Sequence, residues 1–133
     1  MLPETCVAIE RDTDIVTARQ KGRELAAASG FSSTDQTLVA TAISEMARNI
    51  VTHAERGEIV LVALDDSGRR GIMVVARDEG PGIADADLAM KDGYSTANSL
   101  GVGLPGARRL MDEFHLASTL GKGTTVTMKK WVR

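Results

Sequence analysis

The strongest constraint on the fold is an apolar stripe between residues 39 and 50. Its members recur at i, i+3, i+4 and i+7, which is the spacing of one helix face: Val39, Ala42, Ile43, Met46 and Ile50. Just before the stripe, Ser33 and Gln36 have the spacing of a capping box. We therefore expect a long helix from Ser33 to about Thr52 or His53, with one face buried against another layer of structure.

The rest of the chain predicts strands for this helix to cover. Two hairpins are expected, each made of two β-like runs around a turn: residues 58–64 and 71–76 around 65–68, and residues 114–119 and 124–132 around 121–123. A first strand at Thr5–Glu10 and a helix at Asp14–Ala28, ended by Gly30, precede the long helix, and another helix is expected at Pro105–Glu113. This order predicts an α/β two-layer sandwich, a mixed, mostly antiparallel sheet with helices on one face. A doubly wound parallel sheet fits less well.

Composition excludes several classes of protein. A chain of 133 residues suits one domain, here residues 1–133. The net charge of −2, and only two Phe, one Tyr and one Trp, argue against nucleic-acid binding. The single cysteine, Cys6, is expected to be a free thiol in a reducing compartment. Because neither a signal peptide nor a membrane-spanning apolar stretch is found, we expect a soluble cytoplasmic protein that does not contact membranes.

Two polar side chains border the apolar stripe of the long helix. Glu45 and Asn49 lie one turn apart on one line along its edge. A carboxylate and a carboxamide placed in this way can converge on one ligand. The alternative is a solvated pair at the boundary of the core.

A second motif follows the apolar run that ends near residue 76. In Asp78-Glu79-Gly80-Pro81-Gly82, two glycines and a proline form a tight turn that lets a flat ligand approach the backbone. Asp78, at the end of the strand, can accept hydrogen bonds from an amine. A plain Pro-Gly turn is the alternative.

A third motif opens the helix expected after residue 100. Gly101, Val102, Gly103 and Gly106 belong to a GxGxxG segment, whose backbone N–H groups at a helix N-terminus suit a phosphate. The spacing also matches a dinucleotide fingerprint, but that motif needs a strand just before the first glycine. Here residues 95–99 form a loop, so the dinucleotide interpretation fails.

The fourth motif, Gly121-Lys122-Gly123-Thr124-Thr125, begins the last strand, and a hairpin turn explains its glycines by itself. Taken in order, however, the four motifs resemble the N, G1 and G2 boxes and the terminal Gly-Thr of the GHKL ATP-binding superfamily, over roughly residues 35–132. The flanking segments 42–50, 93–96 and 104–114 are similar to the RsbT-type serine/threonine kinases, the switch kinases of the stressosome.

The resemblance implies a role for each motif residue. Glu45 would be the general base or position a water, Asn49 would coordinate the Mg²⁺ that bridges the ATP phosphates, and Asp78 would bind the adenine amine. The other implied cofactor-binding residues are Gly82 and Thr124 beside the ring, Gly101, Gly103 and Gly106 with phosphate-facing backbone, and Gly80 and Val102, with residues 87–100 as the ATP lid.

The same resemblance implies a function. The protein would use Mg²⁺ and ATP to phosphorylate STAS-domain proteins of a stress-signalling complex and, when released, would activate a PP2C-type phosphatase. One departure stands at Ser99, where some related anti-sigma kinases carry a lid arginine; Arg48, Lys91 or Arg108 are candidates to replace its charge near the γ-phosphate.

Three other functions are compatible with parts of the sequence. An anti-sigma-like module, in which ATP sets partner choice with little phosphoryl transfer, is the main one. A fragment of a gyrase or chaperone ATPase is disfavoured because only 18 residues separate Gly82 from Gly101. A histidine phosphorylation site is disfavoured because neither His53 nor His115 lies on a long helix preceding the ATP domain; both are expected at the surface or its boundary.

Overall fold

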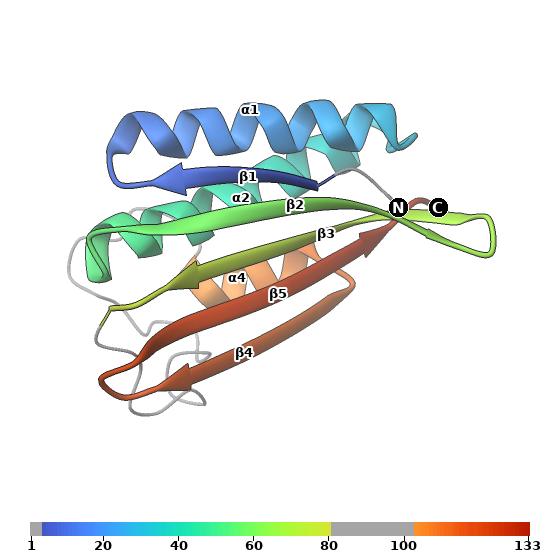
Figure 1. Ribbon diagram of the computed structural model, residues 1–133. Helices are drawn as coiled ribbons and strands as arrows, with labels where there is room; N and C mark the ends of the chain where they lie inside the picture. The colour runs from blue at the N-terminus through green and yellow to red at the C-terminus, as the bar shows by residue number, and fades with distance from the viewer. Residues whose placement is uncertain (1–3, 81–102) are drawn as a thin grey trace.

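A computed structural model describes residues 4–80 and 103–133, which form a sheet with helices packed on one face (Figure 1). The elements, in chain order, are β1 (Glu4–Ile9), α1 (Asp12–Ala28), α2 (Ser33–His53), β2 (Gly57–Asp66), β3 (Arg69–Asp78), α4 (Gly103–Leu110), β4 (Glu113–Thr119) and β5 (Gly123–Trp131). The predicted two-layer α/β sandwich is therefore confirmed. No helix within these described ranges has the length and apolar character needed to cross a bilayer.

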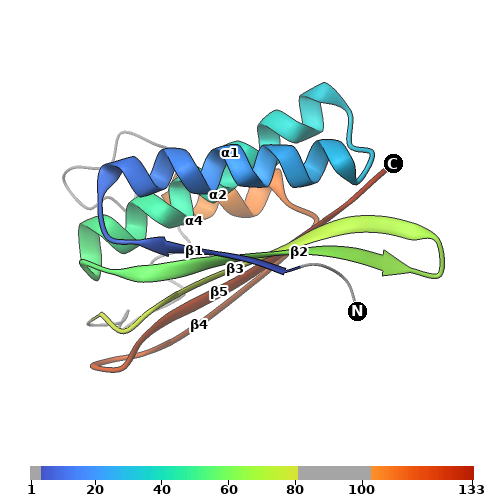
Figure 2. The same ribbon diagram turned by 45° about the horizontal axis from the view of Figure 1, so that its top comes forward.

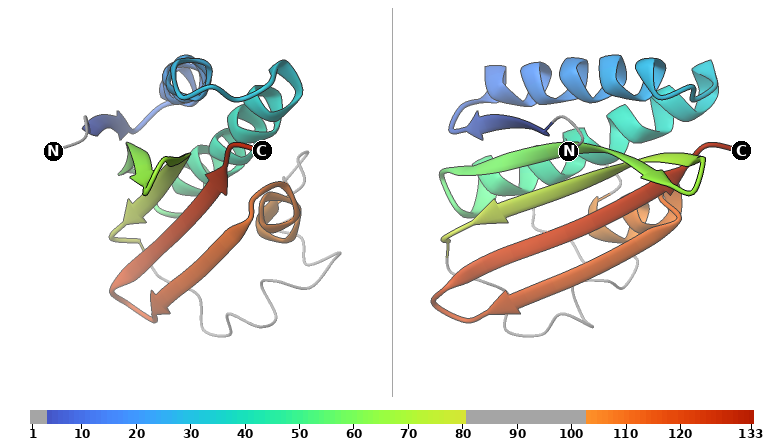
Figure 3. Two further views of the ribbon diagram at one scale, coloured as in Figure 1. Left: turned by 90° about the vertical axis from the view of Figure 1, so that its right-hand side faces the viewer. Right: turned by 45° about the vertical axis from the view of Figure 1, so that its right-hand side comes forward.

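The sheet has the strand order β1-β2-β3-β5-β4, and every pairing among its five strands is antiparallel. The sequence allowed a mixed sheet, whereas the described strands pair without a parallel contact. Helix α1 packs against α2 and β1, and α2 packs against α4 (Figures 2 and 3). Because β5 inserts between β3 and β4, the end of β3 and the start of β5 become neighbours.

The predicted hairpin of β2 and β3 is longer than expected because its turn is shorter. Asp66 pairs with Arg69, so only Ser67 and Gly68 lie between the strands. Both have positive φ, 56° and 89°, as the two-residue turns that match strand twist require. The expectation that Asp65 and Asp66 belong to the turn is therefore wrong, since both continue β2.

Several boundaries of the predicted helices also shift. The N-cap of α2 is Ser32, whose Oγ accepts a hydrogen bond from the Asp35 backbone N–H at 3.1 Å. Gln36 does not complete a capping box with Ser33; its Nε2 donates to the Phe31 carbonyl at 2.9 Å. Helix α4 begins at Gly103 and ends at Leu110, earlier at both ends than predicted. It cannot continue to Glu113, because β4 begins there.

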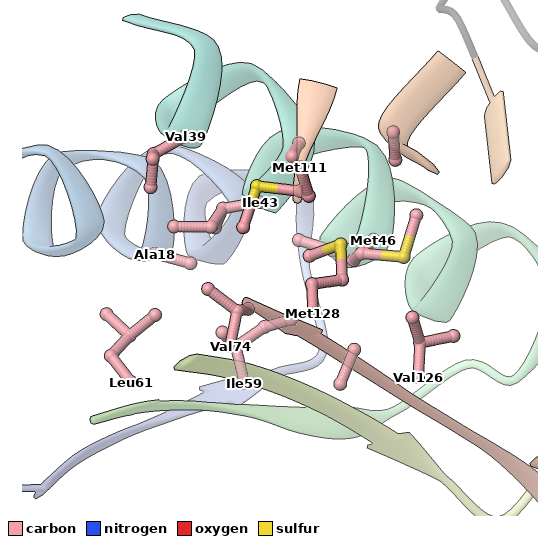
Figure 4. Packing of buried hydrophobic residues seen from close by; sticks show 14 of the residues in the cluster. Ala18, Val39, Ile43, Met46, Ile59, Leu61, Val74, Met111, Val126 and Met128 are labelled. Carbon is pink, nitrogen blue, oxygen red and sulfur yellow. The ribbon is translucent and has the colours of Figure 1, made fainter. Parts of the chain in front are cut away.

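The apolar stripe of α2 forms the centre of the core. Its five predicted members are between 0% and 2% exposed. Figure 4 shows Ile43 and Met46 on the face of α2 that lies over Val74 and Met128 of the sheet. Ile43 of the stripe also contacts α1: a Cβ at Gly22 would stand 2.1 Å from Ile43 Cδ1, so the Ile43 side chain fills the space that a side chain at residue 22 would need. The stripe thus fixes how α2 lies on the sheet, and with it the position of Glu45 and Asn49.

Candidate functional site

Strands β3 and β5 and the end of α2 bring Asp78, Gly80 and Thr124 together. Asp78, the last residue of β3, is paired with Gly57 of β2 on one side and with Thr124 of β5 on the other. A Cβ added to Gly80 would lie 2.5 Å from the Cβ of Ala54, the C-cap of α2. Residues 78–80 therefore leave the sheet beside the C-terminal end of α2.

The carboxylate of Asp78 is anchored through one oxygen. Its Oδ1 accepts hydrogen bonds from the backbone N–H groups of Gly80, at 2.9 Å, and Thr124, at 3.3 Å. Within residues 4–80 and 103–133, Oδ2 accepts none. Asp78 is half-buried. A fixed carboxylate with one oxygen left over is well suited to accept a hydrogen bond from an amine of a flat ligand.

Gly123 makes this anchoring possible, although it was not among the predicted site residues. Its φ is +112°, and a Cβ there would stand 2.1 Å from the Asp78 carbonyl oxygen. Next to it, the Thr124 hydroxyl lies 2.9 Å from Ser118 Oγ, which also donates to the Gly123 carbonyl at 3.1 Å. The Gly-Thr pair of the fourth motif was the signal for this contact, but a hairpin turn explained the glycine equally well.

Glu45 is more buried than its place at the edge of the stripe suggested. It is 5% exposed. Its Oε1 accepts a hydrogen bond from Arg48 Nη1 at 2.5 Å, and its Oε2 accepts one from the backbone N–H of Gly103 at 3.1 Å. Helix α4 packs against α2 and covers this edge. The interpretation of Glu45 as part of a solvated pair is therefore wrong, and its carboxylate connects the N box to the first residue of α4.

Asn49 lies one helical turn after Glu45 and is half-buried. Its side chain makes no hydrogen bond to any other residue that the structure describes. No group of three or more His, Cys, Asp or Glu side chains in the described ranges is arranged to hold a metal ion. The side-chain oxygen of Asn49 is still a suitable ligand for Mg²⁺, because this ion is commonly held by one or two protein oxygens together with substrate phosphates and water.

The glycines of the third motif are only partly described. Gly103 starts α4 with φ +66° and is half-buried, and Gly106 is buried in the same helix. Gly82, Gly101, Val102, Ser99 and Lys91 lie outside the described residues, as does the predicted lid at 87–100. The backbone N–H of Gly103 was expected to face a phosphate. In the structure it donates a hydrogen bond to Glu45 instead.

The other candidate groups lie outside this cluster. Cys6 is an exposed free thiol in β1, as predicted, and its S–H donates to Glu58 at 3.0 Å. That hydrogen bond raises the pKa of the Cys6 thiol, with burial and the Glu58 charge adding to it. His53 and His115 are both exposed, which confirms the prediction of a surface role.

Comparisons with known proteins identify the family of this chain. The family model of the histidine kinase-like ATPase domain matches residues 10–130. The chain is 48% identical to serine/threonine-protein kinase RsbT of Bacillus subtilis (strain 168) over 133 residues, 100% of each chain. It is 33% identical to the anti-sigma F factor of Thermoanaerobacter sp. (strain X514) over 99 residues, 71% of this chain and 68% of that protein. A crystal structure of RsbU and RsbW domains from Mycobacterium tuberculosis has the same fold, with a TM-score of 0.67 at 22% identity over 96% of this chain and 32% of the other.

Proposed function

Because the chain belongs to the histidine kinase-like ATPase family and, within it, to the RsbT-type serine/threonine kinases, we propose that it transfers the γ-phosphoryl group of ATP to STAS-domain partner proteins. The observation that carries this proposal is the pairing of a held, buried carboxylate with a carboxamide one turn later on α2. At the end of β3, Asp78 Oδ1 is held by Gly80 and Thr124, which leaves Oδ2 for a ligand amine. Residues 1–133 then act as one ATP-binding kinase domain.

Each residue has a task in this reaction. Asp78 Oδ2 accepts the adenine amine hydrogen, with Gly80, Gly82 and Thr124 forming the surroundings of the ring. Gly101, Val102 and Gly106 contribute to the backbone around the phosphates. Gly103 joins them when its N–H is shared between phosphate and Glu45.

Glu45 handles the proton. The partner's hydroxyl oxygen attacks the γ-phosphorus, the bond from that phosphorus to ADP breaks, and the hydroxyl proton passes to Glu45. A carboxylate has about four lone-pair positions, so the hydrogen bonds from Arg48 and Gly103 leave room for this proton. Asn49 would hold Mg²⁺, which when bound neutralises charge on the phosphates.

The wider role follows from the same kinship. We place the protein in the cytoplasm, in a stress-signalling complex of STAS-domain proteins, and infer that after release it activates a PP2C-type phosphatase. A second function is favoured by the anti-sigma F relatives. In that function ATP sets the conformation of an interaction module, and little phosphoryl transfer occurs.

The test is incubation of the pure protein with γ-labelled ATP, Mg²⁺ and STAS-domain proteins from the same genome. The kinase predicts label on a partner serine or threonine, located by phosphopeptide mapping. Partner binding that depends on ATP but gives no label would support the interaction module instead.

Asn49→Ala tests the metal role in the same samples. We expect a folded protein whose Mg²⁺-dependent ATP affinity falls about 10- to 100-fold, because a ligand oxygen is lost while no hydrogen bond among the described residues is broken. Calorimetry with and without Mg²⁺ measures this. Equal Mg²⁺-dependent affinities in the variant and the wild type would remove Asn49 from the site.

A further inference from the structure

The carboxylate of Glu45 is held by two donors that come from different parts of the chain. The backbone N–H of Gly103, 58 positions away in the sequence, donates to Oε2. Arg48, three residues further along α2, donates to Oε1. Within the described residues, Arg48 is the one cation that forms an ion pair with Glu45. Arg48 therefore supplies the countercharge of this buried acid.

The two partners differ in burial, and this makes the pair unlike an ordinary surface ion pair. The Glu45 side chain is 7% exposed, whereas that of Arg48 is 39% exposed. Exposed pairs at helix spacing contribute little to stability. A buried carboxylate that loses its cation is instead left with an uncompensated charge. Removal of Arg48 therefore disfavours the present, buried orientation of the Glu45 side chain.

We propose that Arg48 is a positioning residue that holds Glu45 in the orientation required for phosphoryl transfer. This inference rests on the proposed function, in which Glu45 accepts the proton of the attacking hydroxyl. With Arg48 removed, Oε1 loses its donor and the carboxylate is held only by Gly103. A base displaced by about 1 Å can slow a reaction about 100-fold. Arg48 thus acts through Glu45.

A different role for Arg48 makes an opposite kinetic prediction. Its guanidinium has five N–H donors, and apart from the hydrogen bond to Glu45 they make none within the described part of the chain. If these groups contacted the γ-phosphate directly, Arg48 would contribute to transfer whether or not residue 45 can act as a base. If Arg48 acts only through Glu45, its removal has no further effect once Glu45 is neutralised.

The experiment is a kinetic double-mutant cycle on the full chain. Single-turnover transfer to the STAS-domain partner and ATP affinity by calorimetry are measured for wild type, Arg48→Ala, Glu45→Gln and the double variant. We expect Arg48→Ala to slow transfer about 10- to 100-fold, with ATP affinity within roughly twofold of wild type. In the Glu45→Gln background, Arg48→Ala should leave the residual rate unchanged.

Two further variants keep the outcome interpretable. Arg19→Ala removes an exposed arginine of α1 and should change nothing. Arg48→Lys keeps the positive charge on an ammonium group, which has three N–H donors but lacks the planar guanidinium. Its rate should lie between those of wild type and Arg48→Ala, and it replaces the alanine variant in the cycle if that protein does not fold. A wild-type rate in Arg48→Ala, or rate losses that multiply in the double variant, would overturn the inference while wild-type transfer still supports the kinase. Absence of transfer by ATP-bound wild type would overturn the proposed function itself, and the role of Arg48 with it.

Discussion

The two ends of β5 carry polar networks of opposite character. At its start, Asp78 Oδ1 is held by two backbone N–H groups, while Oδ2 accepts no hydrogen bond within the described ranges. At its end, the Trp131 backbone N–H donates to Asp112 and its indole N–H donates to Glu113, both at 2.8 Å. Arg133 also pairs with Asp112. The Asp78 network leaves a carboxylate oxygen available to a ligand, whereas the polar groups of the Trp131 network bind each other.

Ligand binding and folding stability therefore depend on opposite ends of β5. The far network closes the sheet onto α4, since Lys130 Nζ donates to the carbonyl of Leu110, the last residue of that helix, at 2.8 Å. Arg69 stacks over Trp131, with its guanidinium carbon 4.5 Å from the ring centroid. We expect substitutions at this end to change folding stability, and substitutions at the other end to change ligand binding.

Gly123→Ala should have the largest effect. It is an exception to the expected division, because this substitution at the ligand end of β5 should lower the folding stability. The new Cβ would meet the Asp78 carbonyl oxygen at 2.1 Å, at a φ of +112° that L residues rarely adopt. We expect a loss of roughly 2–4 kcal/mol in the free energy of unfolding. Urea denaturation measures it. Gly121→Ala is the matched control, since that glycine also has positive φ but has open space around its Cβ position; equal losses in both variants would mean that backbone strain alone, and not the contact with Asp78, matters.

Asp78→Asn should weaken ATP binding by roughly 1–3 kcal/mol, since a charged acceptor is replaced by a group that also donates. Discrimination between ATP and GTP should fall with it. Calorimetry with both nucleotides measures the effect, and thermal unfolding checks the fold. If the variant retained the nucleotide preference of the wild type, Asp78 would be only a turn residue.

Asp112→Asn tests the end of β5 that lies away from the candidate site. Its carboxylate accepts a hydrogen bond from the Trp131 backbone N–H and forms an ion pair with Arg133. Neither contact involves a residue of the candidate site. We expect a loss of about 1 kcal/mol in the free energy of unfolding, with unchanged ATP affinity. A clear drop in affinity in the folded variant would show that the two ends are coupled.

Much of this arrangement could be predicted from local sequence. The periodic apolar residues predicted α2 and its buried face, and glycine-punctuated apolar runs predicted both hairpins, because these signals come from neighbours in the chain. The predicted N-cap of α2 was wrong, because Ser32 and Ser33 are adjacent residues of the same type and either could cap the helix. The spacing alone could not show which of them caps α2.

The site was predicted less completely, because its contacts join distant segments. Glu45 lay at the edge of a stripe, and only the packing of α4 on α2 shows that it is buried and receives the Gly103 N–H. The contact of Gly123 with Asp78 depends on β5 inserting between β3 and β4. Residue spacing carries no information about such an order. The pairing of Arg48 with Glu45 has helix spacing, yet the same spacing also suits two solvated side chains.

The variant Glu45→Gln tests most directly whether Glu45 accepts the proton of the attacking hydroxyl. ATP affinity and single-turnover phosphorylation of a STAS-domain partner are measured in the same preparation. Glutamine keeps the shape of the side chain but cannot take the hydroxyl proton, so the loss belongs mainly to the transition state. We predict nearly unchanged ATP affinity and transfer slowed by about 10²- to 10⁴-fold. Undiminished transfer in a folded, ATP-binding Glu45→Gln variant would contradict the account.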